Sequence, residues 1–383
     1  MKNFLARCVT LSFITLLLAG CHGFFEKDNT PTPTPITRFH AEIQPQRLWS
    51  TRAGSGAGND NLIMPMALSS QSIFTASTNG VVTAIDSKTG QKQWQVNTGL
   101  PLTSGPGTGH DLVVVGSRKG EIMALRQQDG VPLWKVDVAG EIIAQPAISQ
   151  NTVVIKAVDG RVHALSTRDG HTLWSFVRNE PGLILRGASA PLIHHNHVIA
   201  GFASGTLAKL TLNGGHELWQ QTIASPEGAF AIERMVDIDA DPILFNNDLY
   251  AATYQGKISM LDWNTGRIRW SHTISSYSGM AADADGIYIS DAEGYVWSFT
   301  TNSGLVNWRQ TKLQARLISG PAIMGDYVVV GDQEGYLHWL NKKDGHFSAR
   351  EKLGSAIKAA PMVQNKVLYA LTNNGHLIAY TLP

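Results

Sequence analysis

The chain has 383 residues, of which 43% are hydrophobic and 16% are charged, so it can build a large buried core. Its 31 Lys and Arg residues nearly balance its 30 Asp and Glu residues, for a formal net charge of +1. This balance, without a long run of like charges, argues against a nucleic-acid-binding protein and against a charged disordered tail.

The chain begins with the features of a secretory signal over residues 1–20. Lys2 and Arg7 are combined with an apolar run of about eleven residues, which is too short to span a bilayer as a stable helix. Residues 18–21, Leu-Ala-Gly-Cys, resemble the bacterial lipobox and predict that Cys21 is lipidated and becomes the first residue. The alternative is an ordinary signal peptide followed by a chance cysteine. By resemblance to lipoprotein sorting rules, His22 in place of Asp favours the outer membrane.

The remaining cysteine and the segment after Cys21 set the domain boundaries. Cys8 lies inside the signal, so no disulfide is predicted in the mature chain. Residues 22–40 contain a Thr-Pro tract, which disfavours helix and favours an extended chain. We therefore expect a lipidated cysteine with a flexible tether over 21–40 and a single domain over 41–383.

From Val81 onward one pattern recurs until the chain ends. An alternating apolar segment, a polar turn closed by Gly and a second segment with Trp predict a β-hairpin, first at residues 81–94. The Trp four residues after the turn Gly recurs at Trp94, Trp134, Trp174, Trp219, Trp270 and Trp308, and Ala349 takes its place in a seventh copy. A second series of turn glycines, from Gly80 to Gly375, counts eight units.

A period near 40 residues with about four short strands is typical of a propeller blade, since one such sheet cannot bury both of its faces alone. The sequence predicts an all-β, eight-bladed β-propeller with four antiparallel strands per blade. The last unit ends at Pro383 without an outer strand, whereas residues 44–51 supply an unassigned strand with Trp49. We predict that this N-terminal strand closes the last blade and removes an open sheet edge.

Two successive connections between blades are enlarged. From the outer-strand Trp to the Pro of the next blade the distance is 12 residues after Trp94 and Trp134, but 17 after Trp174 and 23 after Trp219. In an antiparallel blade these connections emerge on one face of the ring, and insertions in repeat proteins often carry function.

These two loops contain the candidate site residues. The first loop, 178–191, presents Leu183, Ile184, Leu185 and Arg186, and the second, 224–242, contains Glu233, Arg234, Asp237, Asp239 and Asp241. An Arg near carboxylates, with aliphatic residues around it, predicts a protein-binding patch. The alternative is that Arg186 pairs with Asp237 or Asp239 only to hold the two loops together.

The lipobox, the repeats and three segments together resemble the BamB family, lipoprotein subunits of the β-barrel assembly machinery of the outer membrane. The segments are LILRGASAP at 183–191, ERMVDIDADP at 233–242 and VVVGDQEGYLHWLN at 328–341. The resemblance implies a non-enzymatic scaffold without a cofactor, anchored by lipid to the outer membrane and facing the periplasm. It implies binding to the POTRA domains of the barrel subunit BamA, and contact with unfolded outer membrane proteins as a further option. The family's contact positions match Leu183, Leu185 and Arg186 in the first loop and Asp237 and Asp239 in the second.

The sequence also has features in common with proteins of other functions. The repeat also resembles quinoprotein dehydrogenases, which bind pyrroloquinoline quinone (PQQ), but those enzymes are longer and have an adjacent-cysteine disulfide at the quinone site. A propeller can also bind a small ligand in its central channel as a sensor. No catalytic or metal site is predicted: the histidines at 194, 195 and 197 are interpreted as a solvated turn, with a metal ligand set as the alternative. Calcium at the carboxylates of 237–241 is a second metal alternative.

Overall fold

The computed structural model describes residues 31–58, 60–185 and 189–383. The chain divides into two compact units, Met1–Pro33 and Thr34–Pro383. The expected signal segment and Cys21 lie outside the described residues. Among the residues that are described, no helix is long and apolar enough to cross a membrane.

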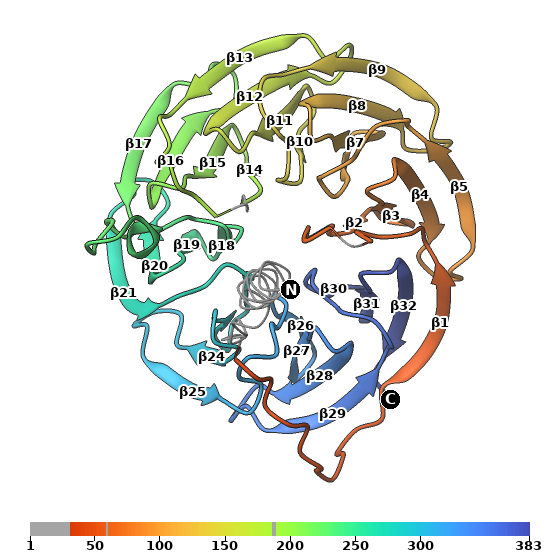
Figure 1. The fold of residues 1–383 in the computed structure, drawn as a ribbon, viewed down its shortest axis with the longest axis vertical. Coiled ribbons are helices and arrows are strands. Elements are labelled where there is room, and N and C mark those ends of the chain that lie inside the picture. Colours follow the sequence, from red (N-terminus) through yellow and green to blue (C-terminus); the bar gives the residue numbers. More distant parts are fainter. Residues whose placement is uncertain (1–30, 59, 186–188) are drawn as a thin grey trace, which may run out of the picture. The chain divides into compact units, whose positions relative to one another are not determined.

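The unit Thr34–Pro383 is a ring of eight four-stranded antiparallel sheets, which confirms the predicted eight-bladed propeller (Figure 1). Blades one and two contain β2 (Ala67–Leu68), β3 (Ser72–Ala76), β4 (Val81–Asp86), β5 (Lys92–Asn97), β6 (Gly107–Gly109), β7 (Leu112–Gly116), β8 (Glu121–Arg126) and β9 (Pro132–Asp137). Blades three and four contain β10 (Ala147–Ile148), β11 (Thr152–Lys156), β12 (Arg161–Ser166), β13 (Thr172–Val177), β14 (Leu192–His194), β15 (His197–Gly201), β16 (Thr206–Thr211) and β17 (Glu217–Thr222).

The other half of the ring repeats the same plan. Blades five and six contain β18 (Ile243–Phe245), β19 (Asp248–Ala252), β20 (Gly256–Asp262), β21 (Ile268–Ile274), β22 (Met280–Ala282), β23 (Ile287–Ser290), β24 (Val296–Phe299) and β25 (Val306–Gln310). Blades seven and eight contain β26 (Ala322–Met324), β27 (Tyr327–Gly331), β28 (Tyr336–Asn341), β29 (Phe347–Lys352), β30 (Met362–Gln364), β31 (Val367–Leu371), β32 (His376–Thr381) and β1 (Gln46–Arg52). A 3-10 helix, η2 (Ala231–Arg234), lies between β17 and β18.

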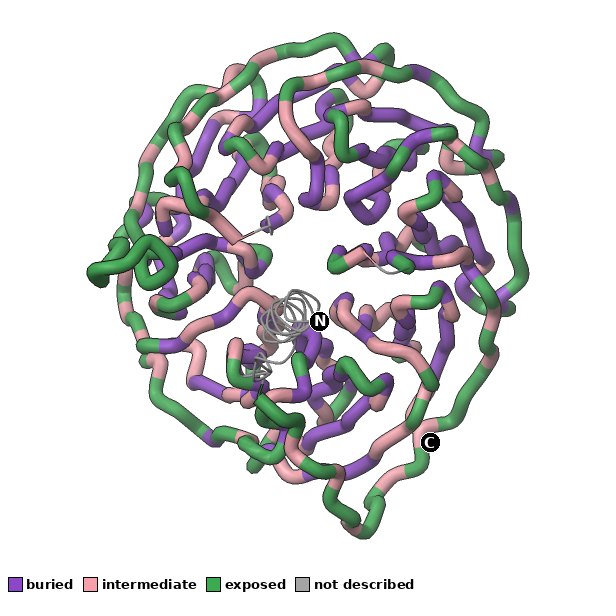
Figure 2. The backbone as a smooth tube through the Cα atoms, in the orientation of Figure 1, coloured by how far each residue is buried: buried purple, intermediate pink, exposed green. Residues whose placement is uncertain are grey.

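The core lies between neighbouring blades. Every residue of β3, β7 and β11 is buried, because both faces of these strands pack on adjacent sheets. Phe74 and Val82 of blade one, for example, share a cluster with Val113 and Val115 of blade two. The outer strands alternate between exposed and more buried residues, so the outer rim of the ring is largely exposed and the inner strands are largely buried (Figure 2).

Each outer-strand Trp forms a joint with the next blade. The indole ring of Trp94 lies 2.6 Å from the position that a Cβ atom would occupy at Gly130. Gly130 has a φ of 73°, so both the space and the backbone require glycine. Trp94 Nε1 donates a hydrogen bond to the Gln127 carbonyl at 3.0 Å, and Trp134 Nε1 donates to the Thr167 carbonyl at 2.9 Å. The spacing of Trp and Gly in the sequence therefore marks the contact between blades.

The two ends of the propeller meet in blade eight. Strand β1 pairs antiparallel with β32, with Gln46 opposite Thr381 and Ser50 opposite Ile378. The Trp49 ring packs on Gly90 of blade one as the other joint rings pack on their glycines, but its Nε1 atom has no hydrogen-bond partner among the described residues. The predicted closure of the last blade by the N-terminal strand is confirmed.

The segment before β1 is bound to the propeller. The Thr34 amide donates to the Gln314 carbonyl at 3.0 Å, and Arg350 Nη1 donates to the Thr37 carbonyl at 2.8 Å. The sequence predicted a flexible tether up to residue 40, and these contacts correct that boundary to Thr34. We call residues 34–43 the strap.

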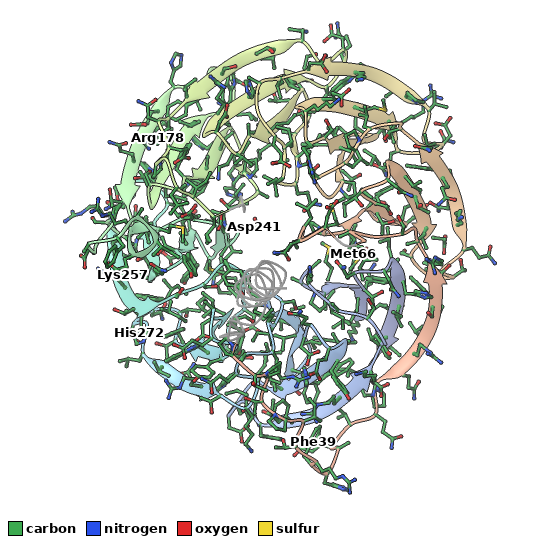
Figure 3. All side chains as sticks on the ribbon, viewed as in Figure 1. Phe39, Met66, Arg178, Asp241, Lys257 and His272 are labelled. Carbon is green, nitrogen blue, oxygen red and sulfur yellow. The ribbon has the colours of Figure 1, made fainter. Side chains whose placement is uncertain are left out.

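The strap covers the outer strand of blade seven. The Glu42 amide donates to the Ser348 carbonyl at 2.9 Å, and the Phe39 ring stacks on Phe347 with 5.5 Å between ring centroids (Figure 3). Strand β29 is consequently more buried than the alternating outer strands of blades one and two. It is also the outer strand in which Ala349 replaces the joint Trp. The strap thus protects the sheet edge at the junction that has no tryptophan joint.

Candidate protein-binding site

The two enlarged loops connect adjacent pairs of blades. The first runs from β13 to β14, and the second from β17 to β18. Both lead from the outer strand of one blade to the inner strand of the next, so they emerge on the same face of the ring. Arg186 belongs to residues 186–188 of the first loop, which lie outside the described residues.

Backbone-to-carboxylate hydrogen bonds join the loops. The Leu185 amide donates to Asp237 Oδ1 at 2.9 Å, and the Ala190 amide donates to Asp241 Oδ1 at 2.6 Å. These two bonds lie on either side of Arg186 in the sequence. Two aspartates of the second loop therefore hold the backbone of the first.

The predicted contact residues differ in exposure. Leu183 is 47% exposed and faces solvent, and Leu185 is partly exposed. Asp237 is only 1% exposed, and its Oδ2 atom has no hydrogen-bond partner among the described residues. In this conformation Leu183 is accessible from solvent, whereas the Asp237 carboxylate is buried and accepts a hydrogen bond from the Leu185 amide.

The carboxylates of the second loop sit in a crowded environment. Burial and the neighbouring charge of Asp237 raise the pKa of Asp239 to about 7. Asp241 lies on the inner side of the ring (Figure 3). Part of its side chain is exposed, but the protein atoms around the carboxylate remove enough water to raise its pKa to about 6. Burial likewise raises the pKa of Asp237. The loops are thus held by acids whose charged forms are partly destabilised.

Sequence reasoning missed two members of this charged cluster, Lys156 and Glu180. Lys156 ends β11 and is buried; burial lowers its pKa, and the surrounding carboxylates oppose that shift. Burial raises the pKa of Glu180, and Lys156 opposes that shift. A signal for Lys156 was present in the repeat. The matching strand ends in the other seven blades are uncharged: Ala76, Gly116, Gly201, Ala252, Ser290, Gly331 and Leu371.

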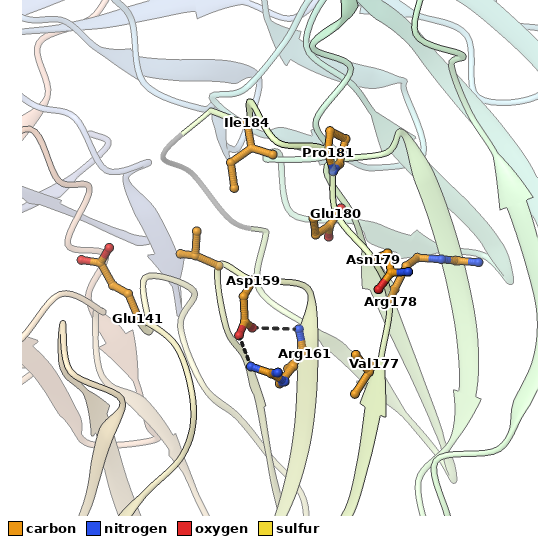
Figure 4. Close-up of a pocket in the computed structure, with 10 residues that line it drawn as sticks. Glu141, Asp159, Arg161, Val177, Arg178, Asn179, Glu180, Pro181 and Ile184 are labelled. Carbon is orange, nitrogen blue, oxygen red and sulfur yellow. Dashed lines mark hydrogen bonds and ion pairs between the residues drawn. The ribbon is translucent and has the colours of Figure 1, made fainter.

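An open groove of about 620 Å³ lies beside the first loop (Figure 4). Its lining includes Ile184 and Pro181 of that loop and the ion pair between Arg161 and Asp159. The mixture of aliphatic and charged groups around a shallow surface suits contact with a protein better than enclosure of a small molecule.

The histidines at 194 and 197 pack around Trp263. The His194 ring lies 5.2 Å and the His197 ring 6.0 Å from that indole, centroid to centroid. Burial lowers the pKa of both histidines. Within residues 31–58, 60–185 and 189–383, no group of three or more His, Cys, Asp or Glu residues is arranged to hold a metal ion.

Comparisons with known proteins identify the family. The family described as outer membrane protein assembly factor BamB matches residues 78–310 and 299–382. The protein of that name from Legionella pneumophila (strain Paris) is 45% identical over 352 residues, which cover 92% of this chain and 92% of the relative.

Solved structures agree with this assignment. The structure of BamB from Moraxella catarrhalis has a TM-score of 0.81 at 27% identity and matches 88% of this chain and 100% of its own. A europium-containing methanol dehydrogenase has a TM-score of 0.73 at 13% identity, over 88% of this chain and 93% of its own, and shows the shared fold alone. The chain belongs to the BamB family of outer membrane protein assembly factors.

Proposed function

We propose that this protein is a non-enzymatic scaffold of the β-barrel assembly machinery that assists the folding and insertion of outer membrane proteins. It is anchored to the outer membrane through lipid on Cys21 and faces the periplasm. Its partner is the POTRA region of BamA, and the two interlocked loops form the contact surface. Leu183 and Leu185 supply apolar contacts, and Arg186 and Asp239 supply charged ones. Asp237 and Asp241 hold the backbone that presents them.

The observation that carries this proposal is the pair of hydrogen bonds that join the loops. Leu185 and Ala190 are fixed from the second loop at either end of the segment that contains Arg186. A loop fixed before binding loses less conformational freedom when a partner arrives, which favours affinity. The relatives named as assembly factors support the choice of partner.

The lipid anchor contributes by restricting the protein to the membrane surface. A partner in the same membrane is then encountered at a high effective concentration, so a moderate interface gives stable association. A few loop residues can therefore suffice to keep BamA associated.

The test is affinity co-purification of BamA with the full-length protein from detergent-solubilised outer membranes. We expect Arg186→Glu to remove BamA from the purified material, because charge reversal at an interface centre is strongly unfavourable. The matched control is Arg168→Glu, the same charge change at an exposed residue in the turn between β12 and β13, on the opposite face of blade three.

A melting curve of each variant separates binding from folding. Loss of BamA with an unchanged melting temperature supports a contact role for Arg186. A large drop in the melting temperature instead indicates that Arg186 acts only in holding the two loops together. Failure of the wild-type protein to recover BamA overturns the proposed function.

A further inference from the structure

The second loop carries an apolar protrusion that the proposed contact residues do not include. Phe230 and Ile232, at and just after the start of η2, are 68% and 61% exposed. The segment between β17 and β18 projects past the outer rim near β17 and β21 (Figure 1, green), and the tube there is exposed (Figure 2). We call Phe230 and Ile232 the apolar tip. Such exposure of two large apolar side chains costs solubility unless another surface covers them.

The backbone of the apolar tip is held in place by its own polar residues. Glu233 Oε2 accepts hydrogen bonds from the Ala229 amide at 2.8 Å and the Phe230 amide at 3.1 Å. Arg234 donates from Nε to the Gly228 carbonyl at 3.0 Å and from Nη2 to the Ala229 carbonyl at 2.9 Å. The tip is therefore a compact turn that is ordered before any partner is present, which is favourable for recognition.

These bonds also determine which partner the tip suits. Glu233 and Arg234 carry opposite charges, and each directs its side chain to the backbone of the turn, so the tip has no excess positive charge. Attachment to an anionic membrane surface depends on such a charge. A convex, electrically balanced tip with an aromatic residue instead fits an apolar pocket on a folded protein domain, where aromatic anchors contribute most of the binding energy.

We propose that the apolar tip is a second anchor for the partner already named, inserted into an apolar pocket of the BamA periplasmic region. This inference rests on the proposed function. The tip and Asp237 belong to one loop, and Asp237 holds Leu185 of the other, so the tip is part of the same pair of interlocked loops as the proposed contact residues. The partner is thus held at two points: by the apolar residues of the first loop and by the tip near the rim.

The experiment measures the affinity of detergent-solubilised, full-length BamA for the full-length protein immobilised in the same detergent. We expect Phe230→Ala to weaken binding by about tenfold to thirtyfold, as for an aromatic anchor, and the double variant with Ile232→Ala to weaken it further. The ratio between wild type and variant should be the same at low and high salt, because the contact is apolar.

The matched control is Leu305→Ala. Leu305 is 67% exposed and lies in the turn between β24 and β25, which emerges on the opposite face of blade six. We expect this variant to bind BamA like the wild type. Melting curves should be unchanged for all three variants, since the replaced side chains are mostly in solvent.

The outcomes separate the two proposals. If the wild type binds BamA and Phe230→Ala binds equally well, the apolar tip is not an anchor and the proposed function is unaffected. If the wild type does not bind BamA, both proposals are overturned. If the Phe230 variant changes only the sedimentation of the isolated protein, the tip contacts a second copy of this chain and the inference is wrong.

Discussion

At the residue scale, the joints between blades rest on single tryptophans. Trp134 is almost fully buried, packs on Gly170 and donates a hydrogen bond to the Thr167 carbonyl. We expect Trp134→Ala to lower the free energy of unfolding by roughly 3–5 kcal/mol, because an aromatic side chain is deleted from a packed interior. Chemical denaturation monitored by circular dichroism measures this change.

The proposed binding to BamA should fall in Trp134→Ala only as far as the folded fraction falls, since the residue lies away from the two loops. A variant with undiminished stability would show that the Trp-to-Gly contact is not a joint.

The contacts of single residues differ in how well the sequence predicts them. The joints were predictable because a Trp four residues after a turn Gly is a local pattern repeated down the chain. The burial of Asp237 was not, since nothing local distinguishes an aspartate that accepts from a distant amide from one that faces solvent. Lys156 stands out among the matching strand ends as the charged one, but its role was not predictable, because its carboxylate neighbours lie in the two loops between blades.

At the scale of elements, the strap was the least predictable part of the fold. A Thr-Pro tract predicts an extended chain but does not show which surface that chain will cover. Its partners, such as Gln314 and Arg350, lie some 280 or more residues away. The enlarged loops, by contrast, were predictable from distances between repeated residues, while their mutual hydrogen bonds were not.

Near the C-terminal end of the strap, Glu42 pairs with His346 of blade seven, and this pair depends on pH. His346 Nε2 lies 2.8 Å from Glu42 Oε2, and the hydrogen bond with Glu42, together with Asp344, raises the pKa of His346. The same hydrogen bond, with one from Ser348, lowers the pKa of Glu42. Since the His346 pKa is higher when the strap is bound, its contribution is complete below about pH 6.5 and is lost as the pH rises through the raised value.

We therefore expect the strap to open more often at pH 8 than at pH 6. Hydrogen-exchange protection factors of the Glu42 and Ile43 amides, which both donate to the Ser348 carbonyl, should fall by about twofold to fivefold across this interval. Because protection factors correct for the intrinsic effect of pH on exchange, the change reports the strap itself. In Glu42→Gln most of the pH dependence should disappear; the same dependence in that variant would assign it to another group.

At the scale of the molecule, the ring is closed by pairing of two strands from opposite ends of the chain. Seven blades are each formed by consecutive strands, so their sheets contain only local connections. Blade eight is the exception, since β1 and β32 are separated by nearly the whole propeller. Bringing these ends together has the largest loop-closure entropy in the fold. We infer that this junction is where the ring opens first when the protein unfolds.

A disulfide across the closure tests this inference. Gln46 and Thr381 are direct cross-strand partners near the surface, and the distance between such partners is suitable for a disulfide. We expect Gln46→Cys with Thr381→Cys to raise the melting temperature under oxidising conditions, and reduction to reverse the gain. Thr206→Cys with Thr222→Cys, a partner pair inside the β16–β17 hairpin, is the matched control and closes only a short loop. The closure disulfide should stabilise more than the control, because a longer closed loop restricts the unfolded chain more.

The unfolding rate adds a second comparison: only the closure disulfide should slow unfolding markedly if the ring opens at blade eight. Equal slowing by both disulfides would place the first opening elsewhere in the ring.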